Sequence, residues 1–159
     1  MVMNMKKANI DRIIRWTLVL IWMGVIFAFS SQDVQASSQS SGIVSDVIIE
    51  VVEDTFPDAD ISEDVFEFTL RNAAHFLLYF VLGIFVFIAI SNYNLQWISM
   101  VGISLLIAVL YALSDEVHQY FVPGRAFEIS DLLIDSLGAI LGILLLGILY
   151  SRRAKLQEV

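Results

Sequence analysis

Four apolar stretches, each long enough to cross a bilayer, constrain the fold of this 159-residue chain more than any other feature. They cover about residues 13–29, 73–90, 97–113 and 132–150. A transmembrane helix needs roughly 20 mostly apolar residues, and it satisfies its own backbone hydrogen bonds in lipid. The sequence therefore predicts an all-α, polytopic membrane protein. Residues 1–159 form a single domain, in which four transmembrane helices make a bundle.

The composition agrees with this prediction and excludes other classes of protein. Hydrophobic residues make up 58% of the chain and charged residues only 16%, whereas about a quarter of an average soluble domain is charged. A disordered chain, an ordinary soluble enzyme and a nucleic-acid binder with a basic surface are excluded. Because the chain has no cysteine, it has neither a thiol nucleophile nor a Cys-ligated metal.

The basic residues predict how the bundle is oriented. They flank the first and fourth stretches, at Lys6, Lys7, Arg12, Arg15, Arg152, Arg153 and Lys155. The long connection, residues 30–72, holds ten acidic residues and a single basic one, Arg71. Cytoplasmic loops carry the excess of Lys and Arg. We therefore expect both termini in the cytoplasm and the acidic loop outside.

The N-terminal region leaves one alternative open, and the outer loop has some predicted structure. A signal peptide could be cleaved after Val34-Gln35-Ala36, but the apolar run exceeds the roughly 7–15 residues usual for such peptides, which favours an uncleaved span. Apolar residues at helical spacing over 43–52 predict an amphipathic helix. Ser62 is the expected N-cap of the next helix.

Ionisable residues inside the apolar stretches are the candidate functional residues, because a charge in lipid is costly. Arg71, His75 and Tyr79 follow i, i+4, i+8 spacing and share one helix face. Asp135 lies within an apolar run and needs a partner, for which His75, His118, Arg71 and Arg125 are the candidates. Asp131 suits the first turn of the last helix, with Ser130 as its cap.

A second polar group ends the third stretch. Asp115, Glu116, His118 and Gln119 follow one another there, and Asp115 can share a helix face with His118 and Gln119. A carboxylate one turn from an imidazole can orient the ring for general-base chemistry, or both can ligate a divalent metal. The alternative is that these side chains only cap a helix end at the water interface.

The next segment, Val122-Pro123-Gly124-Arg125, predicts a type II turn with Pro at i+1 and Gly at i+2. The turn would then hold Arg125 at a fixed height above the outer leaflet, where a guanidinium can bind phosphate or carboxylate through two hydrogen bonds. Ser31 and Gln32 follow the first stretch, at the same membrane depth as the outer ends of the other three stretches. Further along, Gly138 and Gly142 would let another helix approach closely. That helix can belong to the same chain or to a second copy in a homo-oligomer through this face.

These segments together resemble the VanZ-like family of small bacterial membrane proteins. The resemblance rests on Phe29-Ser30-Ser31-Gln32, on Arg71-Asn72-Ala73-Ala74-His75-Phe76, and on the run from Asp115 to Arg125 followed by Asp131, Asp135 and Gly138. It implies a bacterial plasma-membrane protein of the cell envelope and an association with resistance to the glycopeptide teicoplanin. It implies no mechanism.

Two functions are compatible with these residues. In the first, Arg71 and Arg125, with Ser31, Gln32, Gln119, Asp131 and Asp135 in the same site, bind an anionic lipid-linked or cell-wall component. In the second, the chain is a membrane-embedded hydrolase or transferase in which His118, Asp115, Glu116 and His75 carry the chemistry, with a divalent metal as an open possibility. A transporter is a weaker third class, because four spans without an inverted repeat make a narrow pathway.

Overall fold

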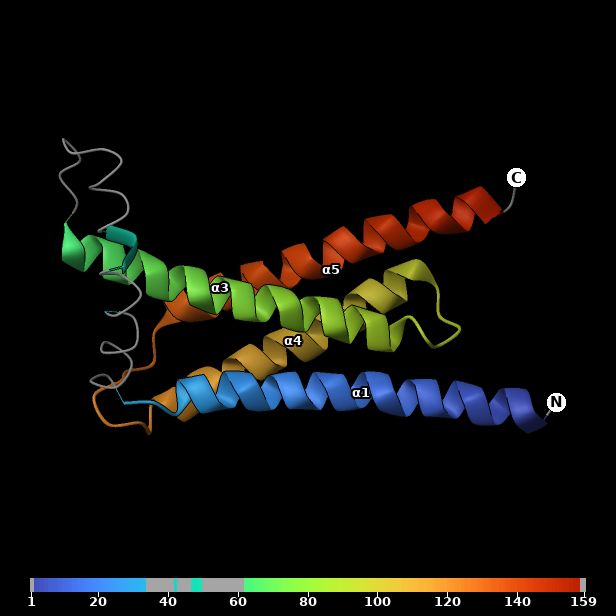
Figure 1. Ribbon diagram of the computed structural model, residues 1–159, viewed down its shortest axis with the longest axis horizontal. Coiled ribbons are helices and arrows are strands. Elements are labelled where there is room, and N and C mark those ends of the chain that lie inside the picture. Colours follow the sequence, from blue (N-terminus) through green and yellow to red (C-terminus); the bar gives the residue numbers. More distant parts are fainter. Residues whose placement is uncertain (1, 34–41, 43–46, 50–61, 158–159) are drawn as a thin grey trace.

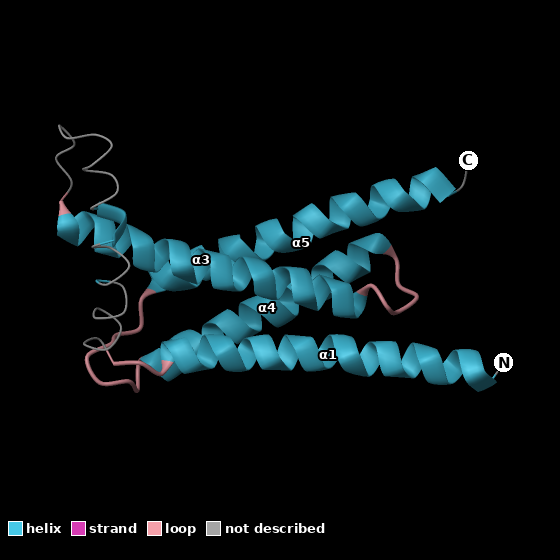
Figure 2. Cartoon of the chain, in the orientation of Figure 1, coloured by secondary structure: helices cyan, strands magenta, loops and turns pink. Residues whose placement is uncertain are grey.

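A computed structural model shows that four long helices make up the bundle, and it describes residues 2–33, 42, 47–49 and 62–157. The helices are α1 (Val2–Ser30), α3 (Glu63–Ile90), α4 (Trp97–Gln119) and α5 (Ile129–Gln157). Within the described ranges there is no strand, so the all-α prediction is confirmed (Figure 2). The predicted signal-peptidase triplet and most of the predicted outer-loop helix lie outside those ranges.

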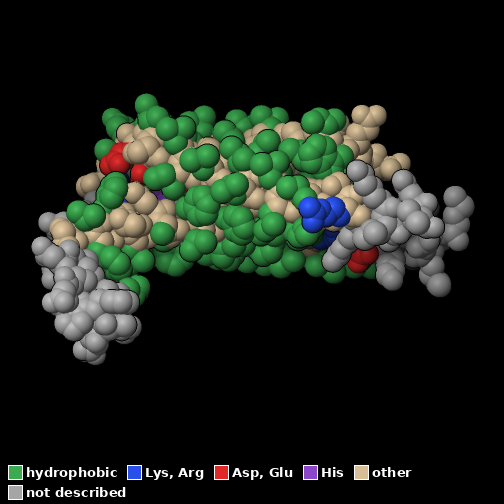
Figure 3. Space-filling model, turned by 90° about the horizontal axis from the view of Figure 1, so that it is seen from above, with side chains coloured by type: hydrophobic (Ala, Val, Ile, Leu, Met, Phe, Trp, Pro, Cys, Tyr) green, Lys and Arg blue, Asp and Glu red, His purple; other side chains and the backbone are tan. Residues whose placement is uncertain are grey.

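Each of the four helices contains a segment long and apolar enough to cross a membrane. These segments are Ala8–Ser30, Val65–Ile90, Trp97–Gln119 and Ile129–Arg152. Many large apolar side chains, such as Leu20, Ile98 and Leu133, are more than half exposed. Figure 3 shows hydrophobic side chains covering the middle of the molecule, with charged ones towards its ends. The chain is therefore a membrane protein with an apolar exterior.

The predicted helix ends differ from the observed ones in an informative way. Ser62 is the N-cap of α3 as expected, although its side chain makes no capping hydrogen bond. Helix α4 continues past residue 113 to Gln119, and α5 begins at Ile129 rather than at residue 132. Ser130 is therefore inside α5, and the prediction that it caps this helix is wrong. The extra turns carry polar residues that are buried against other helices.

Helices α3 and α5 make the closest contact in the bundle. A Cβ atom added at Gly138 or Gly142 would clash with the carbonyl oxygen of Phe76 or Phe80 on α3, and one added at Gly83 would clash with Ala139 on α5. These glycines let two helix backbones touch, as their spacing predicts. The partner is a helix of the same chain. Helix α3 thus covers the Gly138/Gly142 face within one chain, and the homo-oligomer stays a prediction.

Both chain ends lie at one end of the bundle, and the α4–α5 connection lies at the other (Figure 1). Side-chain contacts hold the end with the termini together. The Trp16 indole donates a hydrogen bond to the Tyr93 hydroxyl at 3.1 Å, and Arg12 stacks over the Tyr93 ring. Arg15 donates to the carbonyl of Ile88 at 2.8 Å. The candidate polar residues are at the opposite end.

Candidate functional site

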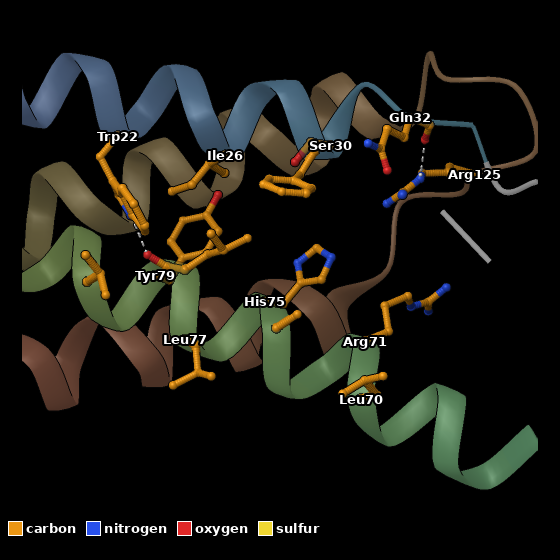
Figure 4. A pocket seen from close by; sticks show the side chains of 14 residues that line it. Trp22, Ile26, Ser30, Gln32, Leu70, Arg71, His75, Leu77, Tyr79 and Arg125 are labelled. Atoms are coloured by element: carbon orange, nitrogen blue, oxygen red, sulfur yellow. Dashed lines mark hydrogen bonds between the residues drawn. The ribbon is translucent and has the colours of Figure 1, made fainter. Parts of the chain in front are cut away.

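A pocket of about 470 Å³ opens between α1, α3 and the α4–α5 connection. Volumes of this size are typical of small-molecule sites. Six of its lining residues are polar: Ser30, Gln32, Arg71, His75, Tyr79 and Arg125. In Figure 4, Arg71 and Arg125 lie at the same end of the pocket and come from opposite sides of it. The pocket thus joins residues that are far apart in the sequence.

Arg125 is held in place by the predicted turn. The Arg125 backbone N–H donates to the Val122 carbonyl at 3.1 Å, and Gly124 has a φ of 79°, as position i+2 of a type II turn requires. The Arg125 side chain donates from Nε to the Gln32 carbonyl at 3.0 Å and from Nη1 to Gln119 Oε1 at 3.2 Å. These bonds fix the guanidinium at the mouth of the pocket.

The two arginines form a site with positive charge. Burial, followed by the nearby charge of Arg71, lowers the pKa of Arg125 below its ordinary value. The Arg71 Nε is buried and has no hydrogen-bond partner in the part of the chain that the structure describes. An anion between the two guanidiniums would offset their repulsion and accept hydrogen bonds from both.

His75 lies deeper in the pocket and is backed by Asp135. Its Nδ1 is 3.3 Å from Asp135 Oδ1, and the two side chains are 14% and 0% exposed. The contact is a close approach rather than an aligned hydrogen bond, because neither atom has a hydrogen-bond partner within the described ranges. Of the four partners that the sequence allowed for Asp135, the structure selects His75. The other ring nitrogen, Nε2, is left for the pocket.

Further buried carboxylates support the site from behind. Asp115, Glu116 and Asp131 are each at most 6% exposed. The Asp115 Oδ2 accepts hydrogen bonds from the Ser30 hydroxyl at 2.7 Å and from Gln119 Nε2 at 3.2 Å. The Glu116 Oε2 accepts one from the Glu128 backbone N–H at 2.8 Å. These bonds join the ends of α1, α4 and α5 around the pocket.

The structure places His118 elsewhere. Its Nε2 is 3.1 Å from the Ser31 hydroxyl, and its ring stacks on Phe27 with centroids 4.4 Å apart. No hydrogen bond joins His118 to Asp115 in the part of the chain that the structure describes, and Asp115 Oδ2 accepts from Ser30 and Gln119 instead. Helix α4 presents Asp115 to the interior and His118 to α1. Consequently His118 does not line the pocket that contains His75.

The predicted site residues therefore separate into three groups. Arg71, His75, Gln32 and Arg125 line the pocket. Asp115, Glu116, Gln119, Asp131 and Asp135 are buried around it. Ser31 and His118 contact each other outside it. Ser30 and Tyr79 also line the pocket but were not among the predicted site residues, although the helical spacing from Arg71 already placed Tyr79 on the correct face.

A divalent metal was left as an open possibility by the sequence, and the geometry of the described residues adds no support for it. Over the described ranges, no three His, Asp or Glu side chains are grouped as metal ligands. The ionic side chains instead divide into an Arg pair at the pocket mouth and a His–Asp pair deeper in. Such an arrangement can bind an anion and place an imidazole beside it.

The fold and site define an α-helical membrane protein with four candidate spans and a charged pocket at one end of its bundle. Residues 15–150 match the VanZ/LLP1 family, and the chain belongs to that family. The resemblance noted in the sequence is thereby confirmed. No curated protein and no solved structure matches the chain significantly.

Proposed function

We propose that this protein binds the phosphate or carboxylate group of a lipid-linked or cell-wall component between Arg71 and Arg125. The observation that carries the proposal is that two guanidiniums from distant segments line one pocket. A guanidinium can hold either anionic group through two parallel hydrogen bonds. Burial and the nearby charge of Arg71 lower the pKa of Arg125, while the carboxylates of Asp115, Asp131 and Glu116 act in the opposite direction. An anion bound at the two guanidiniums would add to this partial compensation.

The location of the site in the cell follows from the charge pattern. Basic residues flank the end of the bundle that carries both termini, which favours a cytoplasmic position for that end. The pocket would then face outward from a bacterial plasma membrane, at the level of the outer leaflet. This is where lipid-linked wall intermediates are used. A role in teicoplanin resistance, which the family resemblance implies, would act through such an envelope component.

Binding of an anionic lipid tests the proposal. We expect phosphatidic acid added to detergent-purified protein to raise its unfolding temperature, whereas phosphatidylcholine with the same chains has little effect. Hydrogen bonds to charged groups contribute about 1.5–3 kcal/mol, so Arg71→Gln or Arg125→Gln should each weaken the response about tenfold or more. Thermal unfolding over a lipid titration measures this.

The control is Arg152→Gln, because Arg152 is exposed at the opposite end of the bundle. This variant should respond to phosphatidic acid as the wild type does. An equal response in all four proteins would show that the two pocket arginines do not bind the anion. Unfolding temperatures without lipid report any effect of the substitutions on folding.

A second candidate function is supported by the pair of His75 and Asp135. Asp135 Oδ1 lies 3.3 Å from His75 Nδ1, and a carboxylate on this side of an imidazole raises the basicity of the other ring nitrogen. In a hydrolysis reaction, His75 Nε2 would take a proton from water as the water oxygen bonds to phosphorus. The bond from phosphorus to the lipid oxygen breaks, and His75 returns the proton to that oxygen. The two arginines would stabilise the charge that develops on the phosphoryl group.

Release of inorganic phosphate from phosphatidic acid and from farnesyl diphosphate tests this alternative. We expect His75→Gln to retain lipid binding but to lose about 10²-fold or more in rate, the usual contribution of a general base. His118→Gln is the matched control, because His118 lies outside the pocket. If the wild type releases no phosphate from either compound, the catalytic function is rejected and the binding function stands.

A further inference from the structure

The charged mouth of the pocket continues into an apolar groove between α1 and α3. Below the arginines its lining is mostly apolar, and His75 and Tyr79 are polar side chains there. The wall residues are Trp22 and Ile26 on α1 and Leu77, Leu78 and Val81 on α3. In Figure 4, Trp22 and Leu77 lie well away from Arg71 and Arg125 along the two helices. A free phosphate would fill only the mouth and would leave this groove unoccupied.

The groove has the depth of one lipid leaflet. Arg71 and Val81 are ten residues apart on α3, which corresponds to about 15 Å at 1.5 Å per residue. Ser30 and Trp22 are eight residues apart on α1, about 12 Å, and α1 runs antiparallel to α3. The hydrocarbon core of a bilayer is about 30 Å thick, so the groove reaches approximately its midplane.

The groove has a fixed floor and an open side. The Trp22 indole donates a hydrogen bond to the Leu78 carbonyl at 2.9 Å and packs edge-on against Phe85, which fixes its ring at the deep end. Two of the lining residues, Phe29 on α1 and Leu77 on α3, are 53% and 58% exposed. Because apolar cavities exclude water, hydrocarbon is the expected content of a groove that opens towards lipid.

We propose that one hydrocarbon chain of the bound anionic lipid lies in this groove, with its tip near Trp22 and its anionic headgroup at Arg71 and Arg125. This inference rests on the proposed function and specifies the ligand as an amphiphile. The continuity of the charged mouth with the apolar walls carries it. A water-soluble wall fragment or a free phosphate would use only the first part of the site.

Trp22 provides a direct test because the chain has only three tryptophans. In the variant Trp16→Phe/Trp97→Phe, all tryptophan fluorescence comes from Trp22. We expect phosphatidic acid with brominated chains to quench it saturably, at a concentration about tenfold lower than brominated phosphatidylcholine requires. The variant Trp16→Phe/Trp22→Phe is the control, because Trp97 lies at the other end of the bundle, where its indole bonds to Gly147. Its quenching should not distinguish the two lipids.

Filling the groove is an independent test. Ala74 lines the pocket, whereas its neighbour Ala73 does not, and both are exposed. We expect Ala74→Leu to weaken the quenching of Trp22 by brominated phosphatidic acid at least about threefold, and Ala73→Leu to leave it unchanged. The response of the unfolding temperature to inorganic pyrophosphate, which has no tail, should be the same in both variants.

The outcomes separate this inference from the proposed function. Trp22 quenching that is equal for the two brominated lipids would overturn the tail site. If phosphatidic acid still stabilises the protein in an Arg125-dependent manner in that case, the anion site stands without the groove. If the stabilisation is also absent, both proposals fail. Equal effects of Ala74→Leu and Ala73→Leu on quenching would likewise overturn the tail site.

Discussion

Replacing His75 by leucine is expected to lower the free energy of unfolding by about 3–5 kcal/mol, the usual cost of leaving a buried charge without its partner. The substitution leaves Asp135, which is 0% exposed, without the imidazole that approaches it at 3.3 Å. Neither Asp135 oxygen has a hydrogen-bond partner among the described residues that could replace this contact. Titration with SDS in mixed micelles measures the loss.

The double variant His75→Leu/Asp135→Leu is the informative comparison. Because two apolar side chains can replace a buried ion pair at little cost, it should recover most of the stability that His75→Leu loses. Such non-additivity is the signature of a direct interaction. If the two single substitutions simply add in the double variant, His75 and Asp135 do not stabilise each other, and the contact is energetically neutral.

Gly142→Ala should destabilise the protein by about 3 kcal/mol, at the upper end of the usual cost of overpacking. The added Cβ meets the backbone carbonyl of Phe80, which cannot rotate away as a side chain would. Helices α3 and α5 would have to separate. The same titration with SDS measures the effect, and a second variant, Gly138→Ala, should behave similarly against Phe76.

The matched control is a Gly→Ala substitution that is expected to stabilise the protein. A Cβ added at Gly102 on α4 meets nothing within 4 Å. Gly102→Ala should therefore show only the better helix propensity of alanine, a gain of about 1 kcal/mol. If Gly142→Ala and Gly102→Ala have the same effect, the α3–α5 backbone contact is not as close as described.

Most of the fold was predictable because lipid imposes a simple rule on the sequence. The apolar runs located all four helices, and the predicted limits at residues 90 and 97 agree with α3 and α4. The limits at residues 113 and 132 were too short for one physical reason. Hydropathy stops at the first charged residue, whereas Asp115, Glu116 and Asp131 remain helical and are buried in the bundle.

The site was only partly predictable. The spacing of residues along a helix shows which of them share a helix face, but it does not show which residues of other helices they contact. The spacing of Arg71, His75 and Tyr79 placed them on one helix face, and all three line the pocket. The partner of Asp135 had four candidates, and only the approach of α3 to α5 selects His75. Likewise, nothing in the sequence indicated that His118 would turn to Ser31 instead of Asp115.

The glycine contacts also determine which parts of this protein can change independently. They join α3 and α5 into one unit that carries the His75–Asp135 pair, while α1 contributes Trp22 and Ile26 to the facing wall. Substitutions at these two α1 positions would alter the width of the groove without touching the ion pair. The width of the groove can thus differ between relatives while the contact between His75 and Asp135 stays the same.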